Sequence, residues 1–550
     1  RNGRRVALVR HNLIGVLNPN SATPDANVRS SVIFYAYNGL GEVTAKVEAN
    51  GDRTDYTYDD FGRLITQADA AIIDYNDAQV RKLTSYVYDA LNNVTTTSER
   101  ASNADFAEGR VTLYNYVRGR LTSVQDAESQ IRFYEYDLAG RLTRESWTRQ
   151  DSQGQNTAER EASVTAYDAA GRVTEQYQAV RNGGTWSRAS VATRLFYNQF
   201  GEVVLRAMSN ADVGGDLVQE KFEYDNAGRL VKTTSGDGVW KALVYDRNGN
   251  ATLTVTSNGY GMAGVSVADI LAHVGPAHST TATDVSVTIT LFDARNLGIA
   301  TIEPGRTVAQ TGDSSLTTTA RLERGRSYNA FGEVLSETDA RGNVTNYSYN
   351  SMGRMVRKQN PKVTVTGENG GQVFRHTVEE YYYDVAGRMV GSRDANGNLT
   401  RRDLLAGTGH GDAEALVTRE YRADGSIWQT RYDVFGQARE IVDGIDRETQ
   451  HVYDKLGRLT QVIRPSGYSE SFGYDILGQR VKNWNSFYTT PVYGTPVSLG
   501  FVPGPDLAPG EPGEPVEITS TPIVGDTPSQ FEYPDYAIQG RVPARRNFAR

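Results

Sequence analysis

The heptapeptide YDDFGRL at Tyr58–Leu64 recurs along the chain as YDLAGRL at Tyr136–Leu142, YDAAGRV at Tyr167–Val173, YDNAGRL at Tyr224–Leu230, YDVAGRM at Tyr383–Met389 and YDKLGRL at Tyr453–Leu459. Fifteen such blocks occur when substitutions are allowed. They begin at Tyr37, Tyr58, Tyr88, Tyr136, Tyr167, Tyr197, Tyr224, Tyr245, Phe292, Tyr328, Tyr349, Tyr383, Tyr432, Tyr453 and Tyr474. Two degenerate copies are predicted at Tyr116 and Tyr421. This recurrence indicates a repeat architecture rather than a set of independent domains.

The second and fifth positions of the block predict a tight turn. The second is Asp in eleven blocks and Asn in four, and the fifth is Gly in thirteen and Asn in two. This pattern is typical of a type I turn that ends in a residue with positive φ, which Gly adopts freely and Asn adopts best among the others. Each block is therefore predicted to be the tip of a β-hairpin. The structural turn residues predicted in the six most regular blocks are Tyr58, Asp59, Gly62, Arg63, Tyr136, Asp137, Gly140, Tyr167, Asp168, Gly171, Tyr224, Asp225, Gly228, Tyr383, Asp384, Gly387, Tyr453, Asp454 and Gly457.

The spacing and the flanking residues predict how the hairpins are joined. Consecutive blocks are often 21 residues apart, as from Tyr37 to Tyr58, and are otherwise farther apart. A constant minimum spacing, with a variable number of additional residues between some blocks, indicates a constant structural unit whose loops accept insertions. Aromatic and aliphatic residues alternate with polar ones on both sides of each turn, so one face of each hairpin is expected to be apolar. The result is an all-β protein, a long antiparallel sheet that coils and buries a continuous aromatic stripe.

The amino-acid composition excludes several classes of function. The 550 residues include 54 Gly, 32 Tyr and no Cys, and the net charge is −8. Without Cys, thiol catalysis, iron–sulfur clusters and Cys-ligated zinc are excluded. The acidic balance argues against a nucleic-acid-binding surface, and no apolar stretch approaches the roughly 20 residues that span a bilayer.

The blocks resemble the YD repeats of the Rhs and teneurin group, which includes bacterial wall-associated proteins and the C components of insecticidal toxin complexes. The resemblance covers about Tyr35 to Val481. It implies a β-hairpin spiral that wraps into a hollow shell or tube, which in bacterial toxins holds a C-terminal effector and in the animal relatives forms part of an adhesion ectodomain. Toxin members usually close the shell with a self-cleaving core that contains a DPxGL-type motif, whereas this sequence contains no Asp-Pro dipeptide. Two interpretations therefore stand at this point: the chain is a segment of a shell, or it belongs to an open or fibrous YD-repeat protein.

Three regions are predicted. Residues 1–34 are a cap or the end of a preceding repeat, 35–484 form the YD-repeat spiral, and 485–550 form an extended strap or linker rich in Pro and Gly. A short helical insertion is expected at Ser266–Val274, because Ser266 and Asp269 form a capping-box pattern and Gly275-Pro276 ends it.

Candidate chemistry is weighed against structural roles. The turn aspartates invite a glycosidase hypothesis, but Asn fills the same position in four blocks and cannot transfer a proton. Glu replaces the repeated Arg in some blocks, so that position is expected to hold a solvated polar residue, with a cation–π contact to a neighbouring Tyr as an addition. His410 is the one histidine in a Gly-rich loop, and the loop Asp394–Asn398 resembles a calcium loop but also an ordinary turn. The five Trp residues follow no period that would make a carbohydrate platform.

These observations predict a non-enzymatic scaffold with no catalytic residue, cofactor or metal. The predicted function is the wall of a shell or tube in a secreted or cell-surface bacterial Rhs-like protein, enclosing or presenting a C-terminal effector. The alternative is a surface fibre or adhesin whose repeats polymerise or bind carbohydrate or neighbouring cells. An enzyme built into an insertion is a third class. The predicted partners are other segments of the same polypeptide, copies of the chain, an encapsulated toxin or surface carbohydrate, without nucleic acid or a membrane span.

Overall fold

The computed structural model describes residues 5–13, 29–105, 109–150, 156–210, 215–275, 284–310, 313–366, 370–411 and 413–487. All of these lie in the first of two units, Arg1–Thr490, and none in the second, Pro491–Arg550. The predicted strap at 485–550 therefore falls almost entirely outside the described residues, and the division into three regions stays a prediction. A first strand, β1 (Ala7–Leu13), pairs with β2 (Arg29–Tyr37), within which the predicted boundary at 34/35 falls.

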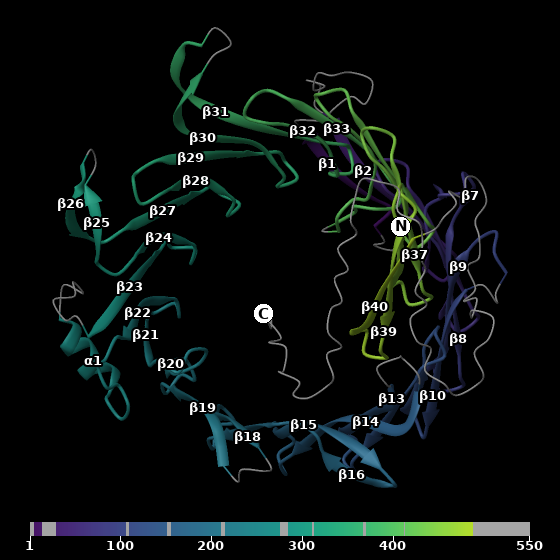
Figure 1. Ribbon diagram of the computed structural model, residues 1–550, viewed down its shortest axis with the longest axis horizontal. Coiled ribbons are helices and arrows are strands. Elements are labelled where there is room, and N and C mark those ends of the chain that lie inside the picture. The colour runs from purple at the N-terminus through teal and green to yellow at the C-terminus, as the bar shows by residue number, and fades with distance from the viewer. Residues whose placement is uncertain are drawn as a thin grey trace, which may run out of the picture. The chain divides into compact units, whose positions relative to one another are not determined.

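The described residues form forty strands and one helix, and thirty-six of the strands make one antiparallel sheet. Each strand pairs mainly with the strands before and after it, so the sheet is a series of hairpins (Figure 1). The first half consists of β1 (Ala7–Leu13), β2 (Arg29–Tyr37), β3 (Val43–Val47), β4 (Arg53–Tyr58), β5 (Leu64–Ala68), β6 (Ile72–Ile73), β7 (Gln79–Val80), β8 (Lys82–Tyr88), β9 (Val94–Ala101), β10 (Arg110–Val117), β11 (Arg120–Gln125), β12 (Ile131–Tyr136), β13 (Leu142–Gln150), β14 (Asn156–Tyr167), β15 (Val173–Asn182), β16 (Thr185–Arg188), β17 (Ala192–Tyr197), β18 (Val203–Asn210), β19 (Gly215–Tyr224), β20 (Leu230–Thr233), β21 (Lys241–Tyr245) and β22 (Ala251–Ser257).

The helix α1 (Val267–Val274) interrupts this series, and β6–β7 and the pair β25 (Arg306–Gln310) and β26 (Asp313–Ala320) are small separate hairpins. The second half consists of β23 (Val285–Phe292), β24 (Gly298–Ile302), β25 (Arg306–Gln310), β26 (Asp313–Ala320), β27 (Glu323–Tyr328), β28 (Val334–Thr338), β29 (Val344–Tyr349), β30 (Met355–Thr366), β31 (Gln372–Tyr383), β32 (Met389–Arg393), β33 (Leu399–Leu404), β34 (Val417–Tyr421), β35 (Ile427–Tyr432), β36 (Ala438–Val442), β37 (Glu448–Tyr453), β38 (Leu459–Ile463), β39 (Tyr468–Tyr474) and β40 (Arg480–Phe487). The all-β, antiparallel hairpin fold is confirmed.

The block at Tyr58 shows the turn geometry. The Asp59 N–H donates to the Arg63 carbonyl at 2.9 Å, the Gly62 N–H donates to the Asp59 carbonyl at 3.0 Å, and Gly62 has φ 77°. The strand register shifts by one residue beside Tyr58, as a bulge requires. Asn92 and Asn296, which stand in the Gly position of their blocks, have φ 65° and 64°. All are consistent with a type I turn that ends in a left-handed bulge.

The YD turns share one edge of the sheet, because strands that enter successive blocks run in the same direction. We call this edge the tip edge, and the opposite edge, which carries the connections between blocks, the loop edge. The degenerate copy predicted at Tyr421 forms the expected turn, since the Gly425 N–H donates to the Arg422 carbonyl and Gly425 has φ 85°, but the turn does not lie on the tip edge. Its turn, closed by a bond from the Arg422 N–H to the Ser426 carbonyl, lies on the loop edge, and the tip position there is taken by the longer loop 405–416.

The expected continuous buried aromatic stripe is not present in the described sheet. Most block tyrosines are only half-buried, and the fully buried strand residues are mainly small, such as Ala162 and Ala207. A single-layer sheet has no second layer to cover its large side chains. Large buried side chains gather where α1 packs on the sheet, among them Met262 and Ile270.

The helix itself is confirmed as predicted. The Ser266 side chain accepts a hydrogen bond from the Asp269 N–H, and Gly275 ends the helix with φ 83°. Its buried side chains pack against strand residues such as Val255 and Val287. Within the described part of the chain, no helix has the length and apolar character needed to cross a membrane.

Candidate functional site

The repeated Arg of the block binds two successive hairpins. In the second block, Arg63 Nε donates to the Asp59 carboxylate at 2.7 Å, and its Nη1 donates to the Asp89 carbonyl of the next block at 3.1 Å. Its guanidinium also lies 4.7 Å from the ring centroid of Tyr88. The same three contacts recur at Arg141, Arg172, Arg229 and Arg458. The expectation of a merely solvated side chain at this position is therefore wrong, whereas the cation–π contact is present.

The block tyrosine makes the second connection. The Tyr58 hydroxyl donates to the Val43 carbonyl in the preceding hairpin at 2.9 Å. Equivalent bonds to the preceding hairpin, of 2.7–3.1 Å, are made by Tyr88, Tyr167, Tyr197, Tyr224, Tyr245, Tyr328, Tyr383, Tyr432, Tyr453 and Tyr474. A half-buried Tyr with a bonded hydroxyl combines apolar contact with a hydrogen bond. This explains why Tyr rather than Phe dominates the first position.

Three blocks replace the Asp–Arg pair of the second and sixth positions with an Asn–Glu pair. Where the second position is Asn38, Asn198 or Asn329, the sixth is Glu, and the Asn amide donates to the Glu carboxylate. The interpretation of the sequence missed this pairing, although the joint change from Asp with Arg to Asn with Glu was a visible signal. Asn350 is the exception, because it is followed by Arg354, which donates instead to the Gly411 carbonyl.

Asn198→Asp is expected to destabilise its hairpin by about 1 kcal/mol, because it sets a second carboxylate where the Asn198 amide lies 2.6 Å from Glu202 Oε2. The double variant Asn198→Asp/Glu202→Arg recreates the common Asp–Arg pair and is expected to recover stability. Urea unfolding of the wild type and both variants checks this. A double variant no more stable than the single one would contradict the pairing.

The side chain in the sixth position of one block also lies against the Gly in the fifth position of the next block. A Cβ built on Gly62 would stand 2.6 Å from Glu42 Oε1, and one on Gly228 would stand 2.9 Å from Glu202 Oε1. Where the next block carries Asn in the Gly position, a donor faces it, since Arg63 Nη1 donates to the Asn92 side chain at 2.9 Å. The residue allowed at this position therefore depends on the preceding block.

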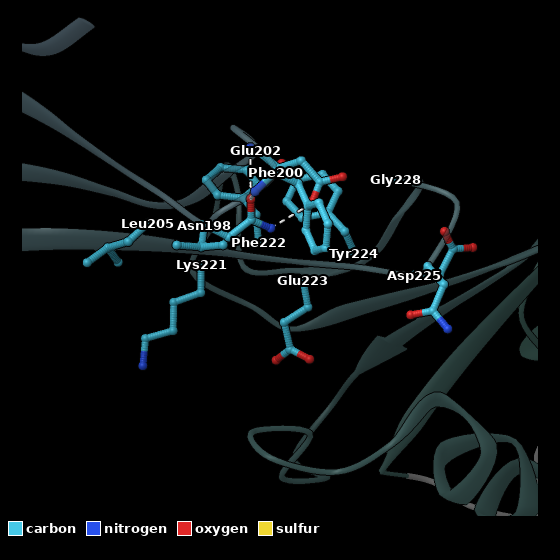
Figure 2. A pocket seen from close by; sticks show the side chains of 12 residues that line it. Asn198, Phe200, Glu202, Leu205, Lys221, Phe222, Glu223, Tyr224, Asp225 and Gly228 are labelled. Atoms are coloured by element: carbon cyan, nitrogen blue, oxygen red, sulfur yellow. Dashed lines mark hydrogen bonds between the residues drawn. The ribbon is translucent and has the colours of Figure 1, made fainter. Parts of the chain in front are cut away.

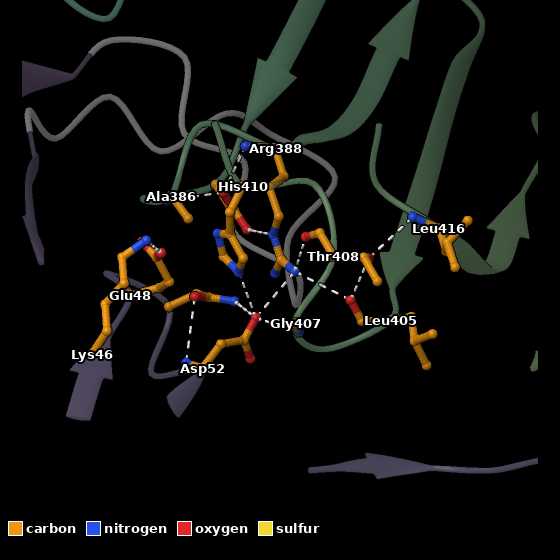
Figure 3. A network of polar contacts seen from close by, with 12 residues as sticks. Lys46, Glu48, Asp52, Ala386, Arg388, Leu405, Gly407, Thr408, His410 and Leu416 are labelled. Atoms are coloured by element: carbon orange, nitrogen blue, oxygen red, sulfur yellow. Dashed lines mark hydrogen bonds and ion pairs between the residues drawn. The ribbon is translucent and has the colours of Figure 1, made fainter. Parts of the chain in front are cut away.

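Late repeats contact the early ones at a polar centre around Asp52 (Figure 3). Asp52 Oδ2 on the loop edge accepts from the Gly407 N–H at 2.7 Å, from Asn50 at 2.7 Å, and lies 2.9 Å from His410 Nε2. Arg388 Nη1 lies 3.6 Å from the same oxygen and also donates to carbonyls of the loop 405–416. His410, a candidate for function, thus serves as a contact between residues more than 350 positions apart.

This contact extends along both edges, and we call it the seam: the tip edge of the described residues between 384 and 479 against the loop edge of those between 48 and 132. Its further contacts are Arg110 with Gln437 and the Phe435 ring, Glu128 with the Lys455 N–H, Arg132 with the Ile476 carbonyl, Arg431 with Asp77, and an apolar cluster of Ile72, Val80 and Leu405. The sheet therefore winds back onto its own beginning, as a spiral does.

The Asp52 carboxylate is held in its charged form. Burial opposes its ionisation, but the hydrogen bonds from His410, Asn50 and the Gly407 N–H and the Arg388 charge outweigh burial and lower its pKa to about 2. Since the ordinary value is 3.8, this group stabilises the fold above about pH 4 and loses that contribution as the pH falls through 2.

Asp52→Asn is therefore expected to lower the free energy of unfolding by about 2 kcal/mol at pH 7, and the difference is expected to shrink between pH 4 and pH 2. Urea titrations of the wild type and the variant across this range measure it. Asp60→Asn, on an exposed tip, is the control and is expected to leave the free energy unchanged. A difference that does not depend on pH would contradict the assignment.

The predicted turn residues lie on six separate hairpin tips, and their Gly residues all have positive φ. Hydrogen bonds from the turn N–H groups and the Arg side chains lower the pKa of Asp137, Asp168 and Asp225. A glycosidase acid needs the opposite, a raised pKa. These carboxylates serve their own turns and do not converge on one site.

The other candidates also have structural contacts. The Asp394 carboxylate accepts from the N–H groups of Asn396 and Asn398, so the suspected calcium loop is a hairpin turn on the loop edge. His451 stands two residues before Tyr453, where other blocks carry an aromatic residue. Its Nδ1 lies 3.2 Å from the Ala438 carbonyl, and burial lowers its pKa. Among the described residues no group of three His, Asp or Glu side chains is placed to hold a metal ion. Trp147 is buried, whereas Trp428 is partly exposed on the loop-edge side.

A hollow of about 960 Å³ lies between two consecutive hairpins (Figure 2). It is lined by residues around Asn198–Glu202 and Lys221–Gly228, and its Asn198 amide is bonded to Glu202. The Tyr224 hydroxyl there donates to the Val203 carbonyl. The first bond closes one turn and the second joins neighbouring hairpins, so the hollow is part of the repeat surface.

Comparison with known proteins identifies the repeat. The RHS repeat family matches residues 37–71, 328–362 and 453–482. Over 160 residues the chain is 28% identical to the double-stranded DNA deaminase toxin A of Burkholderia cenocepacia (strain H111), a match that covers 28% of this chain and 11% of that toxin.

Solved structures give weaker likenesses. The TcdB2-TccC3-Cdc42 crystal structure matches with 15% identity and a TM-score of 0.32, covering 85% of this chain and 27% of that one. The Photorhabdus luminescens Tc holotoxin pore, with a mutated TccC3, matches with 15% identity and a TM-score of 0.31, covering 86% and 26%. The chain thus spans about a quarter of these structures and about a tenth of the toxin.

Proposed function

This chain carries RHS repeats in three stretches, and from that premise we propose that it is a non-enzymatic scaffold, the wall of a shell in a secreted or cell-surface bacterial protein. The wall surrounds an effector carried C-terminal to it in the same polypeptide. The seam is the observation that supports this proposal most directly, because a wall needs contacts between successive turns of the sheet and not only between neighbouring hairpins.

The chemistry of the repeat supports a structural role. The Arg, Tyr and Asp side chains of the block, which a catalytic site would have to use, are bonded within their turn or to the adjacent hairpin. Carboxylates with lowered pKa values do not supply a general acid. Activity assays on protein without an effector test the non-enzymatic part of this proposal.

A reporter fusion tests the wall. A small folded enzyme joined after Arg550 is expected to be cleaved by added protease more slowly than the same enzyme joined to residues 491–550 alone. The seam variant Asp52→Asn/Arg388→Met is expected to restore rapid cleavage, because it weakens the contact between turns. Equal cleavage rates in the fusion and in the control would overturn the enclosing role.

The alanine variant Asp59→Ala separates a structural from a catalytic role for the turn carboxylates. It removes the acceptor of the Phe61 and Arg63 N–H groups and is expected to cost about 1 kcal/mol of stability. Its toxicity in the intact polypeptide is expected to match that of other variants of equal stability. Loss of a measurable turnover on Asp59→Ala, with the fold intact, would overturn the non-enzymatic assignment.

A further inference from the structure

The tip edge of the early and middle repeats presents large apolar side chains to solvent. Phe61, Phe200 and Phe331 stand directly before the Gly of their turns and are 83%, 82% and 90% exposed. Leu91 and Leu138 are likewise exposed at their tips. A row of exposed aromatic and aliphatic residues along one edge is a typical mark of an interaction surface.

The same edge is covered where the seam exists. Phe435 occupies the same position in its turn as Phe61, and the Arg110 guanidinium lies 3.5 Å from its ring centroid. Ile476, the third residue of the block that begins at Tyr474, is 5% exposed, and its carbonyl accepts from Arg132, whereas Leu456 in the tip between them is 38% exposed. An apolar tip is therefore sheltered when the loop edge of another turn of the sheet lies against it.

The complementary edge is also exposed at the other end of the described chain. The loop edge of the last repeats presents Ile445, which is 70% exposed, together with Ile427 and Trp428 beside the turn Arg422–Ser426. Among the described residues, the sheet thus presents one exposed edge of each kind found in the seam. Both are continuous with the seam, since they are the same two edges of the same sheet.

We propose that copies of this chain associate head to tail, with the tip edge of one copy seated on the loop edge of the last repeats of the next. The occupant is a second copy because the chain itself supplies both halves of a contact that it already makes internally. The two surfaces differ, so the interface is heterologous and adds further copies in a line. This association goes beyond the wall function and does not depend on an effector.

Sedimentation velocity of the full chain over a concentration series tests the proposal. The wild type is expected to form dimers and longer species as its concentration rises. The tip variant Phe61→Asp/Phe200→Asp and the loop variant Ile427→Asp/Ile445→Asp are each expected to associate roughly tenfold or more weakly, since buried aromatic and aliphatic anchors dominate interfaces. Val87→Asp, on an exposed strand face, is the control and is expected to associate like the wild type.

Mixing the two variants identifies the contact. The tip variant keeps its loop edge and the loop variant keeps its tip edge, so the mixture is expected to form a one-to-one dimer and no longer species. Thermal unfolding of every variant verifies its fold, and a variant that is not folded is replaced by the corresponding serine substitutions. A wild type that stays monomeric, a mixture that does not dimerise, or a loop variant that dimerises alone by tip-to-tip contact would each overturn head-to-tail association.

Discussion

Arg388→Met is expected to open the seam while the ordinary repeats stay folded. The Arg388 side chain is 9% exposed, and its guanidinium contacts the Asp52 and Asp384 carboxylates, both of which the variant leaves without this cation. Removing one partner of a buried charge pair costs about 3–5 kcal/mol, and the remaining bonds of Asp52 reduce the expected loss to about 2–3 kcal/mol. Hydrogen exchange is expected to show reduced protection of the amides in residues 48–52 and 405–416.

Arg172→Met is the matched control, because it replaces the Arg in the same position of a block that joins two consecutive hairpins outside the seam. Arg172 is 35% exposed and contacts its own Asp168 and the next hairpin. We expect a loss of about 1 kcal/mol or less, confined to those two hairpins. An equal effect of both variants on residues 405–416, or no effect of Arg388→Met there, would show that Arg388 does not hold the seam.

The Gly of the turn is expected to respond to the preceding block. Gly62→Asn is compatible with φ 77° but sets its side chain against Glu42 Oε1, where a Cβ would lie at 2.6 Å. We expect a loss of about 2 kcal/mol, from the displaced Glu42 and the residual strain. Gly62→Val adds a β-branched side chain at positive φ and is expected to cost about 3 kcal/mol. Urea unfolding measures both losses.

Gly171→Asn is the control, because the side chain that faces it is Arg141, whose Nη1 would lie 3.7 Å from the Cβ. This arrangement matches the natural pair of Arg63 and Asn92, in which Arg donates to the Asn side chain. Gly171→Asn is therefore expected to change stability by less than about 0.5 kcal/mol. If both Asn variants were equally destabilising, φ alone would govern this position.

Local geometry was predictable from the sequence to a large extent. The Asp or Asn opening the turn, the residue with positive φ and the helix capped by Ser266 all depend on interactions within about five residues. The sequence also contained the Asn–Glu pairing, which a comparison of the second and sixth positions would have shown. The aromatic stripe was predicted as buried because alternation shows which residues share a face but not whether a second layer covers that face.

The candidate site was less predictable. His410 was noticed for its Gly-rich loop, but nothing near it in the sequence indicates Asp52 as its partner. The solvated interpretation of the repeated Arg failed for the same reason, since one of its contacts lies in the next hairpin, up to 29 residues away. Contacts of this kind follow from strand pairing, which brings the sixth position of one block beside the next turn.

The sequence alone therefore determined the hairpin, its turn and its repetition, because a turn requires only that a few adjacent residues adopt compatible backbone angles. Only the tertiary structure decided which edges meet. The approach of residues 388–476 to residues 52–132 depends on the twist and curvature that accumulate over many strands, and each strand adds a small rotation that no local pattern records.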